Sequence, residues 1–228
     1  MPLDDFFFYV NVCTEIYTGH VVPGGPAQVR PLPGLRITKV SVGPMDNNAY
    51  LLEDAAGGRC LIDAAAEPER LVAVVGKGRL DLVVTTHRHA DHWGALAEVV
   101  NVTGARTAAG RTDAHAIPVP TSDPLDDGET LPVAGLRVIA LQGHTPGSIA
   151  LLYDDPYGTP HLFTGDSLFP GGPGKTTSPE DFASLMDDLE DKVFGQLPDS
   201  TWIYPGHGRD TTLRAERPHL AEWRARGW

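Results

Sequence analysis

The sequence predicts a layered α/β sandwich, and three features support this fold class. Runs that alternate between apolar and polar residues, as strands do, are interspersed with stretches whose apolar residues recur at helical spacing. Several strands also follow one another as hairpin-like pairs, a mixture that favours a layered sandwich over a simple doubly wound sheet. Clusters of polar residues fall where strand runs end, and α/β folds commonly bind ligands at strand ends. A chain of 228 residues with 41% hydrophobic side chains can bury the core that this fold needs.

The regular pattern begins at Arg36, and the residues before it are expected to form an extension. Prolines and glycines between positions 23 and 34 interrupt any regular element there. The chain is therefore divided into an N-terminal extension over residues 1–35 and one domain over residues 36–228. In the first half of the domain, strands are predicted over residues 35–42, 48–52, 60–63 and 80–85, and helices over residues 67–75 and 95–102.

The second half of the domain continues the same alternation. A helix is predicted over residues 178–193, because Ser178 suits the N-cap position, Pro179 the first helical position, and two acidic residues follow in the first turn. Strands are predicted over residues 136–141, 149–153, 161–164 and 201–204.

Charge and composition exclude several classes of partner. The formal net charge of −12 repels nucleic-acid phosphates, and glutamates interrupt the basic residues near the C-terminus. No stretch is as long as a membrane span, and the N-terminal apolar run is too short for a signal peptide. Cys13 and Cys60 are expected to be reduced thiols in a cytoplasmic protein. The expected partner is a small-molecule substrate, with no nucleic acid and no membrane, and no pattern specifies an oligomeric state.

The strongest chemical signal is the segment His87-Arg88-His89-Ala90-Asp91-His92, directly after the strand predicted over residues 80–85. Three histidines and an aspartate within six positions are rarely needed for packing. A loop that leaves a buried strand can turn alternate side chains toward one point. His87 and His89 could then face one metal ion while Asp91 and His92 reach a second.

Three further candidate ligands lie at other strand ends, each beside glycine or proline, which permit tight turns. They are His144, Asp166 and His207. Each alone would more often be a loop or turn residue. Together with His87, His89 and His92, however, His144 and His207 bring five of the nine histidines to strand ends. The other four, which are His20, His115, His161 and His219, are expected to be structural or exposed. Imidazole and carboxylate ligands suit zinc, and also iron or manganese.

The order of these motifs resembles that of the metallo-β-lactamase fold superfamily, over about residues 36–210. The resemblance implies a four-layer αββα sandwich with the metal site at one edge. It implies that His87, His89 and His144 hold a first metal ion and that Asp91, His92 and His207 hold a second, with Asp166 bridging both.

Within the superfamily the sequence looks most similar to glyoxalase II, the hydroxyacylglutathione hydrolase. The similarity is carried by residues 46–51 and 163–169. Lys175 stands where that family has a basic residue that contacts glutathione, and a solvated loop lysine is the alternative. Thr177 and Arg209 stand where tyrosines would be expected. Only 21 residues follow His207, fewer than the C-terminal helical domain of that family needs. The resemblance therefore implies the chemistry without implying glutathione as the thiol.

The resemblance implies a binuclear metal-dependent hydrolase that cleaves a thioester or related ester with a hydroxide bridging the two divalent ions. Zinc is the expected metal, and Asp91 and Asp166 are the expected catalytic carboxylates. Asp63 is a candidate acceptor that orients a ligand histidine, with a capping or turn role as the alternative.

Other functions within the superfamily stay open. A mononuclear iron persulfide dioxygenase would use only His87, His144 and Asp166, so the complete second set favours the hydrolase. A lactonase is the other alternative. Asp166 argues against the β-lactamases that carry cysteine there, and the intact set of seven candidate ligands argues against a non-catalytic metal-binding module.

Overall fold

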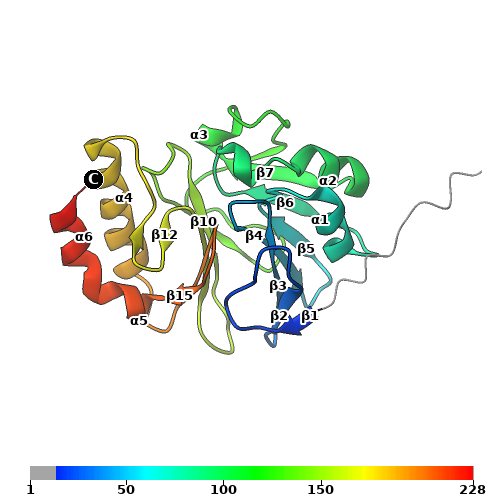
Figure 1. Ribbon diagram of the computed structural model, residues 1–228, viewed down its shortest axis with the longest axis horizontal. Coiled ribbons are helices and arrows are strands. Elements are labelled where there is room, and N and C mark those ends of the chain that lie inside the picture. The colour runs from blue at the N-terminus through cyan, green and yellow to red at the C-terminus, as the bar shows by residue number, and fades with distance from the viewer. Residues whose placement is uncertain (1–13, 228) are drawn as a thin grey trace, which may run out of the picture.

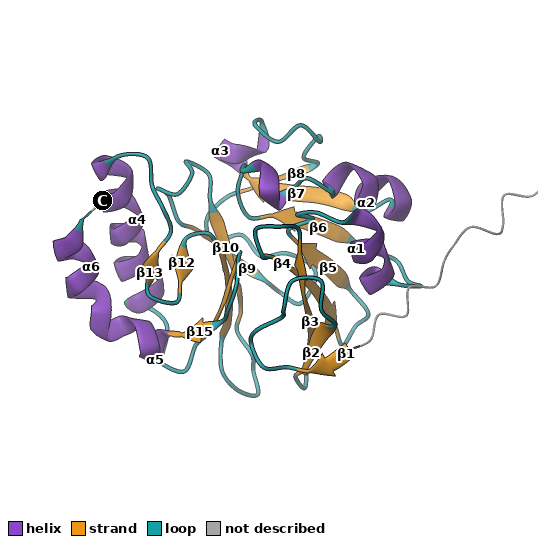
Figure 2. Ribbon diagram, in the orientation of Figure 1, coloured by secondary structure: helices purple, strands orange, loops and turns teal. Residues whose placement is uncertain are grey.

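Two β-sheets pack face to face in the computed structural model, which describes residues 14–227 (Figure 1). Helices cover the outer face of each sheet, so the layers run helix, sheet, sheet, helix across the molecule (Figure 2). This arrangement confirms the four-layer αββα sandwich predicted from the sequence.

The first sheet contains eight strands that lie side by side in chain order, from β1 to β8. The strands from β2 to β5 are antiparallel neighbours, as the predicted hairpins require. The strands from β5 to β8 are parallel neighbours, and helices connect them. The strands are β1 (Thr14–Ile16), β2 (Ala27–Pro31), β3 (Leu35–Val42), β4 (Asn47–Asp54), β5 (Arg59–Ile62), β6 (Leu82–Thr85), β7 (Arg106–Gly110) and β8 (Asp123–Leu125).

The second sheet contains five strands in the order β15-β14-β11-β10-β9. The neighbours β11 and β14 are parallel, and the other pairs are antiparallel. A separate two-stranded ribbon joins β12 (Leu168–Phe169) to β13 (Gly172–Pro173). The five strands are β9 (Arg137–Ala140), β10 (Ile149–Tyr153), β11 (His161–Gly165), β14 (Trp202–Pro205) and β15 (Thr211–Thr212).

Alternate residues of the strands form the core between the two sheets. On β4, Tyr50 and Leu52 face the second sheet, whereas their neighbour Leu51 packs with the helices outside. Tyr50 meets Phe163 and Tyr204 of the second sheet edge to face, with ring centroids 5.2 and 5.6 Å away. Because successive side chains of a strand point to opposite faces, each strand contributes to two apolar layers. The sandwich therefore has one core between its sheets and one outside each sheet.

Helices cover the outer faces of both sheets. On the first sheet lie α1 (Pro68–Val75) and α2 (Leu96–Thr103), with α3 (Arg111–Ala114) following β7. On the second sheet, α4 (Pro179–Asp188) continues into the π-helical segment η2 (Leu189–Phe194). The C-terminal segments α5 (Leu213–Glu216), η3 (Arg217–His219) and α6 (Leu220–Arg226) pack beside α4, and Trp223 of α6 is buried there (Figure 1). None of the helices within residues 14–227 is long and apolar enough to span a bilayer.

The structure differs from the sequence analysis at the N-terminus. No regular element was expected in residues 1–35, but residues 14–16 and 27–31 form β1 and β2 of the first sheet. The prolines and glycines lie mainly in the turn between these strands, so they interrupt the chain without excluding it from the sheet. Residues 1–13, which include Cys13, lie outside the described part of the chain.

Several short elements were missed for a common reason. The strand β7, with the sequence Arg-Thr-Ala-Ala-Gly, is buried in the first sheet but carries no large apolar side chain. The strands β12, β13 and β15 contain two residues each. Elements this short show no measurable periodicity, and their positions follow from pairing with neighbouring strands.

Candidate metal centre

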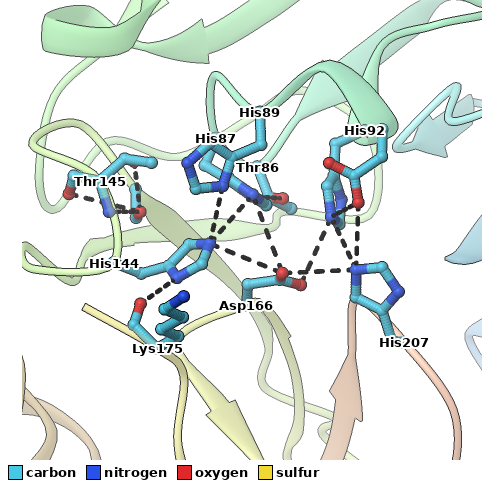
Figure 3. Close-up of polar contacts among 12 residues, drawn as sticks. Thr86, His87, His89, His92, His144, Thr145, Asp166, Lys175 and His207 are labelled. Carbon is cyan, nitrogen blue, oxygen red and sulfur yellow. Dashed lines mark hydrogen bonds and ion pairs between the residues drawn. The ribbon is translucent and has the colours of Figure 1, made fainter. Parts of the chain in front are cut away.

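The candidate ligands meet at one edge of the molecule, between the two sheets. The end of β6 leads into His87 and His89 and then into the 3-10 turn η1 (Ala90–His92). His144 lies in the turn between β9 and β10 of the second sheet. Asp166 and His207 follow β11 and β14, which are parallel neighbours and therefore end at the same edge. Each sheet thus contributes ligands to one cluster (Figure 3).

His87, His89 and His144 form one compact group, here named the first triad. Nε2 of His144 lies 3.0 Å from Nδ1 of His89 and 3.3 Å from Nε2 of His87. The candidate ligand atoms of the three rings all lie within 4.8 Å of one another. Three imidazoles at this spacing match the nitrogen ligand set of a zinc site.

Asp91, His92 and His207 form the second triad. Nε2 of His207 lies 3.2 Å from Nε2 of His92 and 3.4 Å from Oδ2 of Asp91. Asp166 lies between the triads, with Oδ2 3.6 Å from Nε2 of His144 and 3.4 Å from Nε2 of His207. All seven side chains singled out in the sequence are therefore gathered into one cluster (Figure 3).

Backbone carbonyls orient two of the histidines. Nδ1 of His144 lies 2.6 Å from the carbonyl oxygen of Lys175, and Nδ1 of His207 lies 2.8 Å from that of Met45. A carbonyl oxygen can only accept a hydrogen bond, so each Nδ1 carries the proton. The Nε2 atoms of both rings therefore present lone pairs to the centre of the cluster.

Side chains orient His87 and His92 in the same sense. Nδ1 of His92 donates to Oδ2 of Asp63 across 2.9 Å. The hydroxyl of Thr86 also donates to this carboxylate, so its oxygen accepts from Nδ1 of His87, 3.1 Å away. Asp63 and Thr86 are both buried. The Nε2 atoms of both histidines thus also face the centre.

This donor set fits a pair of metal cations. The Nε2 atoms of four imidazoles and two carboxylates converge on one space, and the two carboxylates repel each other unless positive charge lies between them. Within residues 14–227, Oδ1 of Asp166 is buried without a hydrogen-bond partner. A buried carboxylate oxygen costs free energy unless it is paired. Divalent ions would satisfy all of these atoms.

Electrostatics points the same way. Burial, together with the neighbouring imidazole of His92, holds the pKa of His87 well below its usual value. Burial alone would raise the pKa of Asp166, but the imidazoles of His207 and His92 outweigh it and lower that pKa. His92 is also desolvated, yet Asp63 and Asp166 raise its pKa to about 10. The cluster therefore attracts positive charge between Asp166 and the second triad.

Two glycines leave room for the centre. A Cβ atom on Gly206 would lie 2.2 Å from Oδ1 of Asp166 and 2.8 Å from Cε1 of His92. A Cβ atom on Gly174 would lie 1.7 Å from the carbonyl oxygen of Asp166. Both contacts are closer than real Cβ atoms approach, so these positions admit only glycine without movement of the ligands.

Two supporting residues were missed in the sequence. Asp113 on α3 is buried and accepts hydrogen bonds from the loops that carry both parts of the first triad. Asn47 donates from Nδ2 to the carbonyl and to Oδ2 of Asp91, across 2.9 and 3.0 Å. Neither residue belongs to a metal-ligand motif, and their partners lie at least 25 residues away along the chain. Asn47 does lie in the segment 46–51 that resembled the known family.

Lys175, the residue expected to contact the substrate, lies beside the cluster and is exposed (Figure 3). Lys175 contributes its carbonyl to His144, and its side chain extends beside this ring (Figure 3). Thr177 and Arg209 are also exposed. Among the other histidines, His161 is buried against Tyr204, whereas His115 and His219 are exposed.

Comparison with known proteins identifies the family. Residues 42–207 match the metallo-beta-lactamase superfamily, so the chain belongs to this superfamily. It is 38% identical over 169 residues to a hydroxyacylglutathione hydrolase of Fuscovulum blasticum. That match covers 71% of this chain and 62% of the relative, so the chain spans less than two thirds of the relative's length.

Solved structures agree with the assignment. The protein TTHA1623, whose structure is in a di-iron-bound form, is 33% identical and superposes with a TM-score of 0.67, over 78% of this chain and 96% of that one. ETHE1 from Myxococcus xanthus is 28% identical with a TM-score of 0.69, over 81% of this chain and 82% of that one. The fold is therefore shared with proteins of known structure.

Proposed function

We propose that this chain is a binuclear metal-dependent hydrolase that cleaves a thioester or a related ester. The observation that carries the proposal is the cluster itself. Two triads, one of three histidines and one of two histidines and an aspartate, face each other across Asp166. A persulfide dioxygenase that holds one iron on His87, His144 and Asp166 would have no use for the second triad.

The first triad would hold one ion and the second triad the other, with Asp166 between them. Two bound dications, zinc in our proposal, would lower the pKa of water toward neutrality and stabilise the oxyanion of a tetrahedral intermediate. The chain supplies the geometry, because the outer nitrogens of four imidazoles are held by Lys175, Met45, Asp63 and Thr86. These contacts leave the inner nitrogens aimed at the ions before substrate arrives.

The substrate in this proposal is a thiol conjugate that carries a negative charge. The support is the relative named as a hydroxyacylglutathione hydrolase, together with Lys175 exposed beside His144. An ammonium group there can attract a substrate carboxylate as a point charge. Replacing Lys175 with methionine should raise KM for an anionic thioester several-fold and leave kcat nearly unchanged, because the lysine acts in binding only.

The test is metal analysis of the purified protein together with hydrolysis of S-lactoylglutathione, before and after chelation. We expect close to two zinc ions per chain and cleavage that stops when the metal is removed and returns when zinc is added. Asp166→Asn should lose most of the activity, whereas His115→Ala, which changes an exposed histidine outside the cluster, should retain it.

Other results would redirect the proposal. One iron per chain, with oxygen uptake on glutathione persulfide and no thioester cleavage, would establish the dioxygenase. Two metals with cleavage of lactones but not of thioesters would establish a lactonase.

A further inference from the structure

Each triad depends on the alignment of the two sheets. In the first triad, His87 and His89 come from the first sheet and His144 from the second. In the second triad, Asp91 and His92 come from the first sheet and His207 from the second. A small shift of one layer against the other would separate the ligands. Two buried polar clusters outside the triads join the layers, and each lies behind a different triad.

Behind the first triad, Asp113 joins the two loops that carry its ligands. Oδ2 of Asp113 accepts from the backbone N–H of Arg88, 3.0 Å away, in the residue between His87 and His89. Oδ1 accepts from the N–H of Gly147 across 2.9 Å, and the hydroxyl of Thr145 donates to Oδ2. Thr145 directly follows His144. The Asp113 carboxylate is buried, so water cannot replace these contacts.

Behind the second triad, the ion pair of Lys39 and Asp210 joins the first sheet to the loop that carries His207. Lys39 lies on β3 of the first sheet, and its ammonium group is fully buried. Nζ donates to Oδ1 of Asp210 and to the carbonyl of Gly208, each across 2.7 Å. Gly208 directly follows His207. Asp210 also accepts from Nε1 of Trp202 across 2.8 Å, which ties the pair to β14.

The two clusters are separate. Asp113 has no contact with residues 206–210 among its hydrogen bonds and ion pairs in the described chain. Lys39 likewise contacts Gly19, Gly208 and Asp210 but no residue of the first triad. Each cluster can therefore control one triad without the other.

Stability alone is a poor explanation for buried charges at these positions. Burying an ion pair such as Lys39–Asp210 costs about as much desolvation free energy as the attraction returns, and apolar pairs often replace one without loss. The hydrogen bonds, in contrast, fix direction and distance. Both clusters therefore act by fixing the positions of the metal ligands next to them.

We propose that Asp113 and the Lys39–Asp210 pair are positioning residues, each for one metal of the centre. Asp113 sets the geometry of the first triad, and Lys39 with Asp210 sets that of the second. This inference rests on the proposed binuclear site.

The experiment isolates each site and measures zinc affinity at equilibrium against a chromophoric chelator. His207→Ala leaves the first triad, and His144→Ala leaves the second. Asp113→Asn and Lys39→Met are introduced separately into both backgrounds. The affinity of the metal-free chain for zinc is the readout, so substrate and turnover play no part.

With His207→Ala as background, Asp113→Asn should weaken zinc binding by about ten-fold or more, the size expected for loss of a residue that orients a ligand. In that background Lys39→Met should change the affinity less than about two-fold. With His144→Ala as background, the two effects should exchange. This crossed pattern is the signature of separate positioning, since a loss of general stability would weaken both sites together.

Equal effects of each substitution on both sites, or none on either, would overturn the inference and leave the proposed function intact. Failure of the wild-type chain to bind zinc, iron or manganese would overturn both. If Asp113→Asn or Lys39→Met does not fold, Thr145→Val and Asp210→Asn replace them. Thr145→Val removes one donor to Asp113, and Asp210→Asn removes the charge that pairs with Lys39. The same crossed pattern is expected, and its absence has the same meaning.

Discussion

The chemistry of the site is decided at the level of single atoms. Each of four histidines in the cluster has one nitrogen held by an oxygen acceptor, which leaves the other free to face the centre. Five histidines without these partners would sample both tautomers and several ring orientations. The acceptors include two backbone carbonyls, which no change of side chain can remove. Much of the preorganisation therefore comes from the backbone of the loops.

Gly206 offers a sharp test at this scale. Replacing it with alanine places a methyl group against Oδ1 of Asp166 and Cε1 of His92. We expect Gly206→Ala to bind at least one metal ion fewer per chain and to lose most of the proposed thioester hydrolysis, because Asp166 or His92 must move. Gly104→Ala is the matched control, since no atom lies within 4 Å of its added Cβ. The control should cost about 1 kcal/mol of stability from its left-handed backbone and keep both metals. Equal metal content in the two variants would contradict the expectation.

At the level of elements, the start of α4 is specified by local sequence. Oγ of Ser178 accepts a hydrogen bond from the N–H of Asp181, and Pro179 occupies the first turn, as predicted. Ser178→Ala should lower the free energy of unfolding by about 1 kcal/mol, measured by chemical denaturation. Ser178→Thr keeps an acceptor and should recover most of this loss. A Ser178→Ala variant as stable as the wild type would show that packing of Phe182 and Leu185 alone holds the helix.

The pairing of β11 with β14 contains a pH-sensitive contact. His161 is buried, Nδ1 lies 2.8 Å from the hydroxyl of Tyr204, and burial lowers its pKa to about 4. Between pH 6.5 and 4 the unfolded chain takes up a proton that the folded chain refuses, so stability falls as pH decreases. The loss from His161 is at most about 3 kcal/mol. His161→Gln cannot titrate, so its free energy of unfolding should fall less between pH 7 and pH 4.5.

This comparison uses metal-free protein in both cases, because acid also protonates the metal ligands. His115→Gln is the control and should follow the wild-type curve, because it changes an exposed histidine far from the contact between His161 and Tyr204. If His161→Gln also follows that curve, His161 is protonated in the folded state.

Elements also show where prediction from sequence succeeds. His87 and Asp166 could be placed because a short-range signal, a polar residue directly after an apolar strand, coincides with the edge where strands end. The supporting role of Asp113 could not be predicted, because its partners Arg88 and Gly147 contribute only backbone N–H groups, which every sequence contains. The strand β7 was missed because its alanines and glycine carry no periodic signal, and its position depends on parallel pairing with β6. Local sequence patterns therefore identify the candidate metal ligands. The residues and strands that hold these ligands in place depend on long-range pairing, which local patterns do not show.

At the scale of the whole molecule, the metal ions would join the two sheets. The first sheet carries four of the candidate ligands, and the second carries His144, Asp166 and His207. The unfolded chain cannot gather ligands separated by up to 120 positions, so metal binds the folded state far more tightly. Any ligand that prefers the folded state stabilises it, by about 2.7 kcal/mol per site at a free concentration one hundred times Kd.

Removing the metals should therefore loosen the sandwich as a whole. We expect chelation to lower the melting temperature by several degrees and zinc to restore it in proportion to the logarithm of its free concentration. His144→Ala, with one triad disrupted, should show a smaller zinc-dependent rise than the wild type, and His144→Ala combined with His207→Ala the smallest. His115→Ala should respond as the wild type does, because it lies outside the cluster. A melting temperature independent of zinc in the wild type would mean that zinc does not bind the folded chain in preference to the unfolded one, which would contradict the proposed metal centre.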